Sequence, residues 1–301
     1  MLSVGFFRRL AFLTAFFAYL QIALGGVVRV SGSGLGCPDW PLCNGRPYPP
    51  ADIHSIIEYS HRTVGSITGV LVILTVLFAW TTFARRRPVV PVLATASLAA
   101  IAAEGALGGA VVIQELKPWL VLLHLCLAMV ILGLLLATAV MALPATTGVP
   151  RLRALATAGA AATYLMLLSG STVVASGADQ SCHSWPLCGG GTAFDFNGAN
   201  AFTMLHRGTV LVVAALIVYV AFKAIREAPL RPIAIATLAV FALQVAVGAG
   251  TAITDGALFN GLHVAIATLV WSGMLTIALL TPARADRVAA RATLAVERGH
   301  A

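Results

Sequence analysis

The sequence predicts an all-α integral membrane protein whose eight transmembrane helices form two tandem four-helix bundles. Three observations predict this fold class. Hydrophobic residues make up 59% of the 301 residues and charged residues only 10%, whereas charged residues are about 25% of an ordinary soluble domain. The apolar residues gather in segments of roughly 20 residues, the length that crosses a bilayer. One pattern of residues also occurs twice along the chain.

Eight apolar segments are long enough to span a membrane. They lie in order at about 10–30, 57–83, 89–113, 119–142, 152–175, 203–222, 232–253 and 258–280. The first segment follows Arg8 and Arg9, as the apolar part of a signal peptide would, but it is too long for that part and no A-x-A cleavage site follows it cleanly. We therefore expect residues 10–30 to form the first transmembrane helix.

The repeated pattern is a C-x5-C motif with Trp-Pro-Leu inside it, followed by a His-Arg pair. Its two copies are offset by 145 positions without a gap: Cys37/Cys182, Trp40/Trp185, Pro41/Pro186, Leu42/Leu187, Cys43/Cys188, His61/His206 and Arg62/Arg207. Because each half contains an even number of spans, the halves should share one orientation and be related by a pseudo-twofold axis along the membrane normal. The predicted halves are residues 1–147 and 148–301.

The distribution of basic residues predicts how the chain lies in a bacterial cell membrane. Of the 19 Lys and Arg residues, 14 fall at the N-terminus, in the even-numbered connections or in the tail: Arg8, Arg9, Arg85, Arg86, Arg87, Arg151, Arg153, Lys223, Arg226, Arg231, Arg284, Arg287, Arg291 and Arg298. Basic residues favour the cytoplasmic side, so both termini should be cytoplasmic and the loops at about 31–56 and 176–202 outside. The net charge of +8 indicates contact with anionic lipids rather than nucleic-acid binding.

Four of the five cysteines form the two C-x5-C pairs in these outer loops. An oxidising compartment and a Pro-containing turn favour a disulfide within each pair, Cys37 with Cys43 and Cys182 with Cys188. The alternative is a metal or redox site to which His183 would contribute, although the first loop has Pro38 at the matching position. The fifth cysteine, Cys126, is interpreted as a small buried hydrophobic residue.

Each half also carries two histidines inside apolar segments, His61 with His124 and His206 with His263. A single histidine on an apolar helix is usually structural. These four, however, lie about one turn below the outer surface on helices that run in the same direction, so the two imidazoles of each half should sit at one depth. Such a pair is suited to ligate a haem iron from both faces, and polar groups within the bilayer are costly enough to indicate function.

Arg62 and Arg207 directly follow two of these histidines. One interpretation is that their guanidinium groups reach lipid phosphates at the membrane boundary. The other is that each pairs with a haem propionate, for which a bidentate guanidinium is suited.

The two halves differ in their acidic residues. Glu58 lies three residues before His61 and on the same helix face, whereas the aligned residue is Thr203. A carboxylate beside a metal site can act as a base or stabilise positive charge; alternatively, Glu58 is a solvated residue at a helix start. Glu104 has its approximate counterpart in Gln244, and we expect it to form a structural hydrogen bond between closely packed helices.

Three segments together resemble the heme A synthase family: Gly25–Gly34 (GGVVRVSGSG), Cys37–Cys43 (CPDWPLC) and Glu58–Arg62 (EYSHR). The resemblance covers almost the whole chain. It implies oxidation of a methyl group of haem O to the formyl group of haem A, which matures haem for cytochrome oxidase, by successive hydroxylations followed by loss of water.

The same resemblance implies a division of roles between the halves. His61 and His124 would flank the substrate haem O, Glu58 would be the catalytic carboxylate, and His206 and His263 would ligate a haem b cofactor. A haem O synthase and an electron acceptor in the membrane are possible partners.

Two other functions fit part of the pattern. Four buried histidines would equally suit a di-haem b-type electron-transfer cytochrome, but two haems near one membrane face are poorly placed for conduction across the bilayer. A transporter with parallel repeats is disfavoured because no span is interrupted by Pro at mid-membrane.

Overall fold

The computed structural model describes residues 3–144, 150–254 and 256–281, and it confirms the all-helical fold class. Within these ranges only isolated β-bridges accompany the helices. Eight helices have the length and hydropathy needed to cross a membrane, and each matches one predicted segment. They are α1 (Val4–Val30), α2 (Ile53–Phe83), α3 (Val89–Ile113), α4 (Pro118–Met141), α5 (Pro150–Ala175), α6 (Asn200–Ile225), α7 (Arg231–Thr254) and α8 (Ala257–Leu279), with a short 3₁₀ helix η1 (Ala178–Gln180) before α6.

Several helices begin before the apolar segments that predicted them. The first helix starts at Val4 because the Ser3 side chain accepts the Phe6 N–H (3.2 Å), and the second starts at Ile53 because Asp52 accepts the Ser55 N–H (2.9 Å). These side chains satisfy backbone donors that the first turn leaves unpaired. The bond from the Ser55 N–H also holds the pKa of the Asp52 carboxyl below its ordinary value.

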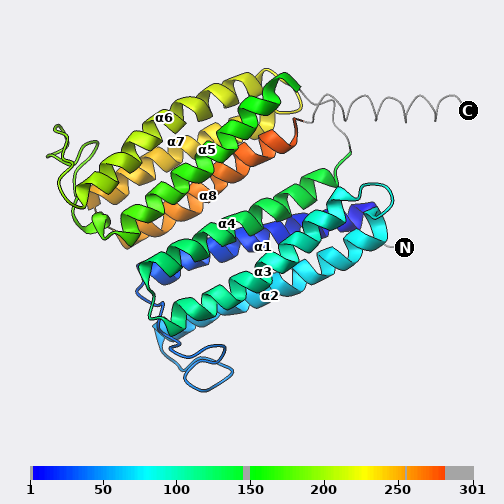
Figure 1. Ribbon diagram of the computed structural model, residues 1–301, viewed down its shortest axis with the longest axis horizontal. Helices are drawn as coiled ribbons and strands as arrows, with labels where there is room; N and C mark the ends of the chain where they lie inside the picture. The colour runs from blue at the N-terminus through cyan, green and yellow to red at the C-terminus, as the bar shows by residue number, and fades with distance from the viewer. Residues whose placement is uncertain (1–2, 145–149, 255, 282–301) are drawn as a thin grey trace, which may run out of the picture.

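The helices form two groups of four, α1–α4 and α5–α8, which lie side by side (Figure 1). In the first group α1 contacts α2, α2 contacts α3, α3 contacts α4, and α4 closes the ring on α1; helices α5 to α8 repeat this pattern. The groups meet through α1 with α8, α4 with α8, and α4 with α5. These contacts map onto themselves when equivalent helices are exchanged, as a twofold relation requires. The axis stays a prediction, and the predicted boundary at 147/148 lies outside the described residues.

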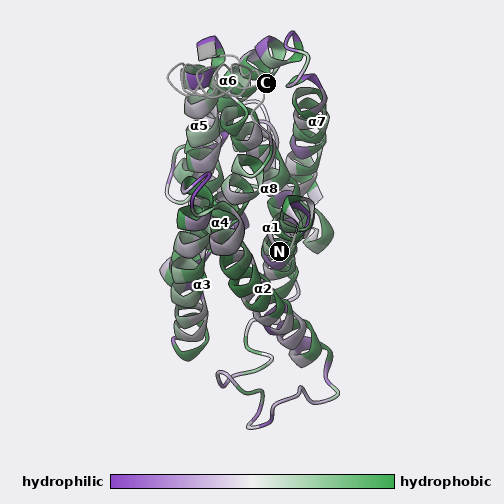
Figure 2. Cartoon of the chain, turned by 90° about the vertical axis from the view of Figure 1, so that its right-hand side faces the viewer, coloured by the Kyte–Doolittle hydropathy of each residue, from purple (hydrophilic) through white to green (hydrophobic). Residues whose placement is uncertain are grey.

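The outer faces of the helices are apolar. Figure 2 shows hydrophobic residues over most of the helical surface, and large apolar side chains such as Leu211 (75%) and Val212 (71%) are exposed. Apolar surface of this extent fits contact with lipid rather than water. The bundle interiors contain many small residues, among them Ala79, Ala139 and Ala221, each 0% exposed. Small residues allow the close helix packing that holds membrane bundles together. The chain is therefore a multi-pass membrane protein.

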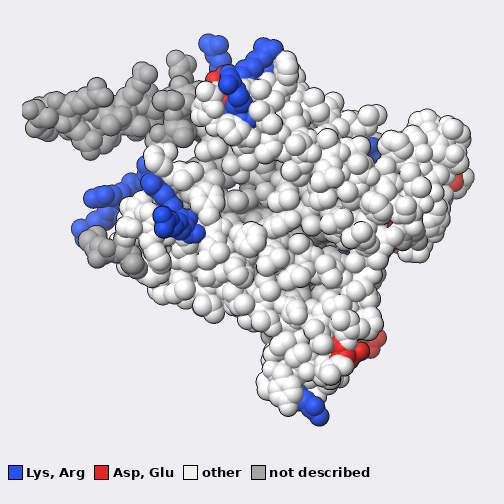
Figure 3. Space-filling model, turned by 180° about the vertical axis from the view of Figure 1, so that it is seen from behind, with Lys and Arg blue, Asp and Glu red and all other residues white. Residues whose placement is uncertain are grey.

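Basic side chains gather at the end of the molecule that carries the α2–α3 and α6–α7 connections (Figure 3). Two of them bind carbonyl groups at the C-terminal end of α4: Arg8 Nε–H donates to Ala142 O (2.8 Å), and Arg87 donates to the carbonyls of Met141 and Leu143. A cation at this position satisfies carbonyls that the helix leaves unpaired. The predicted basic residues of the tail, Arg284, Arg287, Arg291 and Arg298, lie outside the described residues.

Two disulfides close the loops at the opposite end, between Cys37 and Cys43 and between Cys182 and Cys188. The predicted pairing is thus confirmed. In the part of the chain that the structure describes, no group of three His, Cys, Asp or Glu side chains could hold a metal ion, and His183 instead contacts the Gln180 carbonyl (2.9 Å). Cys126 is a free thiol and is half-buried rather than fully buried.

Peptide mapping by mass spectrometry without reduction should recover the Cys37–Cys43 and Cys182–Cys188 links, with Cys126 alone alkylated. Both pairs lie at disulfide-forming separation, with Cα–Cα distances of 4.5 and 5.2 Å. Alkylation of all five cysteines in the native protein would contradict the pairing.

Candidate haem-binding sites

In the first half, two histidines from alternate helices lie against glycines of the neighbouring helices. A Cβ atom added at Gly25 of α1 would lie 3.3 Å from Cε1 of His61 on α2, and one added at Gly108 of α3 would lie 3.2 Å from Cε1 of His124 on α4. Both rings therefore rest on helix backbone. Both histidines belong to one bundle, because α1 to α4 form a closed ring of contacting helices.

The second half repeats this arrangement. A Cβ atom added at Gly170 of α5 would lie 3.0 Å from Cε1 of His206, and one at Gly248 of α7 would lie 3.0 Å from Cε1 of His263. Gly25 and Gly170 have the 145-residue offset of the sequence repeat. The duplication therefore includes the surfaces on which the histidines rest.

Each histidine has a polar neighbour on the glycine-bearing helix. Gln21 Nε2 lies 3.2 Å from His61 Nε2, Ser169 Oγ 2.8 Å from His206 Nδ1, Glu104 Oε1 3.1 Å from His124 Nδ1, and Gln244 Nε2 3.0 Å from His263 Nδ1. The expected link from Glu104 between packed helices is thus present as a close contact. Sequence reasoning missed Gln21 and Ser169. A polar residue in the middle of an apolar span, as Gln21 is, was the available signal.

These residues fit an axially ligated haem. Nδ1 of His61 and Nδ1 of His124 are buried without a hydrogen-bond partner among the described residues, although the Glu104 carboxylate is close to the second. Each half supplies two imidazoles, and its described residues include no group of three His, Cys, Asp or Glu side chains that could hold a metal ion. A macrocycle that fills the remaining coordination positions suits such a site better than a metal ion held by protein alone.

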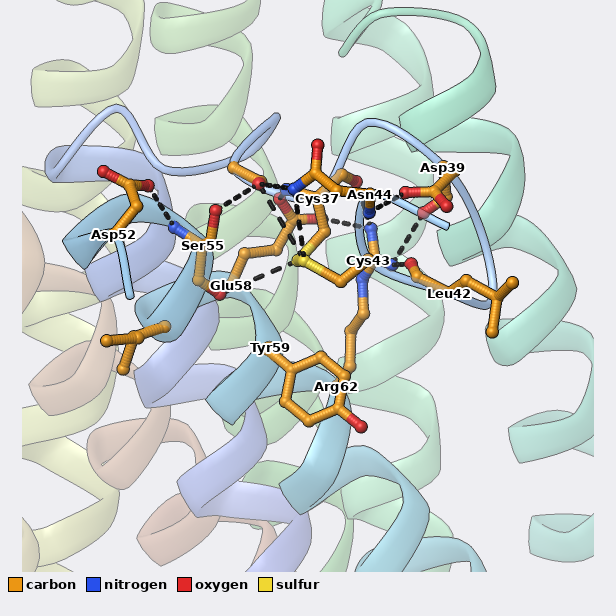
Figure 4. Close-up of a disulfide and its surroundings, with 12 residues drawn as sticks. Cys37, Asp39, Leu42, Cys43, Asn44, Asp52, Ser55, Glu58, Tyr59 and Arg62 are labelled. Atoms are coloured by element: carbon orange, nitrogen blue, oxygen red, sulfur yellow. Dashed lines mark hydrogen bonds and ion pairs between the residues drawn. A yellow bond between two sulfur atoms is a disulfide. The ribbon is translucent and has the colours of Figure 1, made fainter. Parts of the chain in front are cut away.

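Glu58 is joined to the first disulfide loop (Figure 4). Its Oε2 accepts the Cys37 N–H (2.7 Å), and its Oε1 accepts a bond from Arg62 Nη2 (2.5 Å). The residue is only 3% exposed, which overturns the interpretation of Glu58 as a solvated residue at a helix start. The side chain carries a buried carboxylate to the base of the loop.

Arg62 connects the same loop to α2. Its Nη1 donates to the carbonyls of Asp39 (2.8 Å) and Leu42 (2.6 Å), and its Nη2 donates to Cys37 O (2.6 Å) as well as to Glu58. These four bonds leave Nε–H as the remaining donor. The side chain is 15% exposed and turned into the loop rather than out toward lipid.

The loop itself is stiffened by Asp39 and covers the helix that carries Gly108. Asp39 accepts the backbone N–H groups of Asn44 (2.6 Å) and Gly45 (2.7 Å), and the Gly45 bond is the main reason why the pKa of its carboxyl lies below the ordinary value. The Trp40 ring lies on α3 at Gly109, where an added Cβ would be 3.0 Å from Cδ2. One face of this Gly-Gly pair therefore supports His124 and the other supports the loop.

The second half keeps the arginine but lacks the carboxylate. Arg207 Nη1 donates to the carbonyls of Ser184 (2.8 Å) and Pro186 (3.0 Å). Thr203, at the position of Glu58, makes only a long hydrogen bond to Ala178 O (3.4 Å). The two sites therefore share their histidines and loop anchor and differ in buried charge.

Comparison with known proteins agrees with this geometry. Residues 8–275 match the model of the COX15-CtaA family, described as cytochrome oxidase assembly proteins. The chain is 28% identical over 293 residues to the heme A synthase of Geobacillus kaustophilus, with 91% of each chain covered. It is 30% identical over 249 residues to the heme A synthase of Symbiobacterium thermophilum, which covers 76% of this chain and 80% of the relative.

A duplicated set of four half-buried histidines in eight apolar helices, together with a family match over nearly the whole chain, leads to one assignment. The chain belongs to the COX15-CtaA family of cytochrome oxidase assembly proteins.

Proposed function

We propose that this protein is a heme A synthase, an enzyme that oxidises a methyl group of haem O to the formyl group of haem A. The observation that carries the proposal is that the first half has a buried carboxylate, Glu58, three residues before His61, whereas the second half has Thr203 three residues before His206. Membership of the COX15-CtaA family and similarity to heme A synthases support it. A cytochrome that only transfers electrons would have no need of a base or a charge-stabilising carboxylate at the position of Glu58.

In this proposal the halves have different occupants. His61 and His124 hold the substrate haem O, and His206 and His263 hold haem b, which supplies a one-electron redox centre when bound. Arg62 and Arg207 have the charge to pair with propionates near the loops. In the first half this pairing would use Nε–H, because the other donors bind the loop and Glu58.

In this proposal Glu58 is the catalytic carboxylate. Oxidation of the methyl group leaves positive charge on its carbon atom. A carboxylate in a site of low dielectric stabilises that charge or takes a proton from the attacking water. Two successive hydroxylations, each removing two electrons, give a diol that loses water to form the aldehyde. The electrons pass to an acceptor in the membrane, and a haem O synthase supplies the substrate.

We also propose that both termini are cytoplasmic and that the disulfide loops lie outside the membrane. The separation of charge along the molecule supports this orientation, because the basic side chains gather at the end opposite the disulfides (Figure 3) and basic residues favour the cytoplasmic side. The partners are haem, lipid and membrane proteins rather than nucleic acid.

Replacement of His206 or His263 with Ala should abolish the low-spin b-type spectrum of the purified protein, because loss of one axial ligand leaves the iron five-coordinate or releases the haem. Absorption spectra of reduced protein and haem extraction measure this. Unchanged spectra in both variants would refute the second-half assignment.

Glu58→Gln should lower haem A formation by about two to four orders of magnitude while folding and haem b content remain near wild type. The amide keeps the shape but removes the charge. Chromatography of extracted haems measures product and substrate together. Thr203→Glu is the reciprocal control and should not create activity in the second half. Haem A formation at the wild-type rate in Glu58→Gln would make the carboxylate structural.

Gly170→Ala should perturb the haem b spectrum or reduce haem b content, because the new methyl group would lie 3.0 Å from the His206 ring and force the imidazole to move. Gly69→Ala is the matched control, since a Cβ there meets nothing within 4 Å. Identical spectra and haem contents in the two variants would contradict the contact between Gly170 and His206.

A further inference from the structure

The histidine sites also differ in the group that faces the second histidine of each half. In the first half the Glu104 carboxylate lies 3.1 Å from His124 Nδ1. In the second half the Gln244 amide nitrogen lies 3.0 Å from Nδ1 and 3.3 Å from Nε2 of His263. The positions are equivalent, because Gly108 and Gly248, each four residues further along the same helix, rest on the same two rings. A carboxylate in one half thus stands where an amide stands in the other.

The polar neighbour of the Glu104 side chain is His124. Its side chain is 14% exposed, and its second oxygen, Oε2, is buried without a hydrogen-bond partner among the described residues. The distance from Glu104 Oε1 to His124 Nδ1 is that of a hydrogen bond, but the angle is not, because Nδ1 has no hydrogen-bond partner among the described residues. A small rotation of the ring would align it. An acidic side chain inside an apolar span is costly. The position of Glu104 against His124, a candidate iron ligand, therefore requires a physical explanation.

The cause follows from how imidazole binds iron. A histidine that ligates through one nitrogen carries its proton on the other, and it donates that N–H to an acceptor that sets the ring orientation and the ligand's basicity. A carboxylate draws the proton more strongly than a neutral amide does, so the imidazole becomes more electron-rich and favours ferric over ferrous iron. Gln244 can accept the same N–H by turning its amide, because its Oε1 is buried and unpartnered and the two amide orientations have nearly the same shape.

We propose that Glu104 is a positioning residue that acts through His124 to lower the reduction potential of the haem held in the first half. Gln244 gives the second-half haem only a neutral partner. The proposal rests on the proposed function in one respect, that a haem occupies the first site.

The test exchanges the two partners in the full-length protein, purified from cells that also produce haem O synthase. Glu104→Gln gives the first half the amide of the second, and Gln244→Glu does the reverse. Potentiometric titration, followed by absorption and electron paramagnetic resonance, measures the midpoint of each haem, and chromatography of extracted pigment identifies haem O, haem A and haem b. Glu115→Gln is the charge-matched control, because Glu115 lies exposed in the α3–α4 turn.

Glu104→Gln should raise the midpoint of one haem only, by about tenfold in the ferric-to-ferrous equilibrium or about 59 mV for a one-electron couple. Gln244→Glu should lower the midpoint of the other haem, and Glu115→Gln should change neither. Normal haem content with both midpoints unmoved would overturn the proposal. If Glu104→Gln instead loses haem, Glu104→Asp should retain it because the charge is kept, and loss in both variants would overturn a role based on charge.

The outcome separates this inference from the proposed function. Two molecules of haem b per wild-type chain, with no haem O or haem A, would refute the synthase while the Glu104 shift could still be measured on the first-half haem. Haem A in the wild type without that shift would refute the role of Glu104 alone.

Discussion

The contact between an imidazole ring and the backbone of a neighbouring helix is the interaction on which the rest of the structure depends. It occurs in four pairs of sequential helices: α1 with α2, α3 with α4, α5 with α6, and α7 with α8. A Cβ atom on the facing helix would lie 3.0 to 3.3 Å from the ring, so any residue larger than glycine would force the ring or the helix to shift. The position of the four glycines therefore decides both how the hairpins pack and where the histidines can place their nitrogen atoms.

The two halves share this packing and differ in the acidic side chains near their histidines. The first half has two acids near its histidines, Glu58 under the disulfide loop and Glu104 on the ring of His124, where the second half has Thr203 and Gln244. Buried carboxylates are costly in a bilayer, and duplication alone would have placed them in both halves or in neither. In the two proposals each acid has a role in the first half alone, because Glu58 stabilises charge that develops on the substrate and Glu104 acts through His124.

Much of the fold was predictable because its signals are local or periodic. Apolar length predicted all eight spans, and the spacing of Cys37 and Cys43 predicted their bond. Helix starts were less predictable, since the Asp52 cap extends α2 into polar sequence. The partners of Glu58 were not predictable: its spacing from His61 placed both on one helix face, but the Cys37 N–H reaches it through the path of a loop some twenty residues away. Likewise, only the packing of α1 on α2 shows that Gln21 meets His61.

The adjacent glycines Gly25 and Gly26 give the first helix a role in both halves. Gly25 faces His61, while a Cβ added at Gly26 would lie 3.5 Å from the carbonyl of Gly261 on α8, two residues before His263. Thus α1, which supports the ring of His61, also packs against α8 close to His263. An N-terminal half waiting in the membrane would expose to lipid the faces of α1 and α4 that α5 and α8 later cover. A substitution at this pair of glycines would therefore disturb the packing of both halves rather than of one.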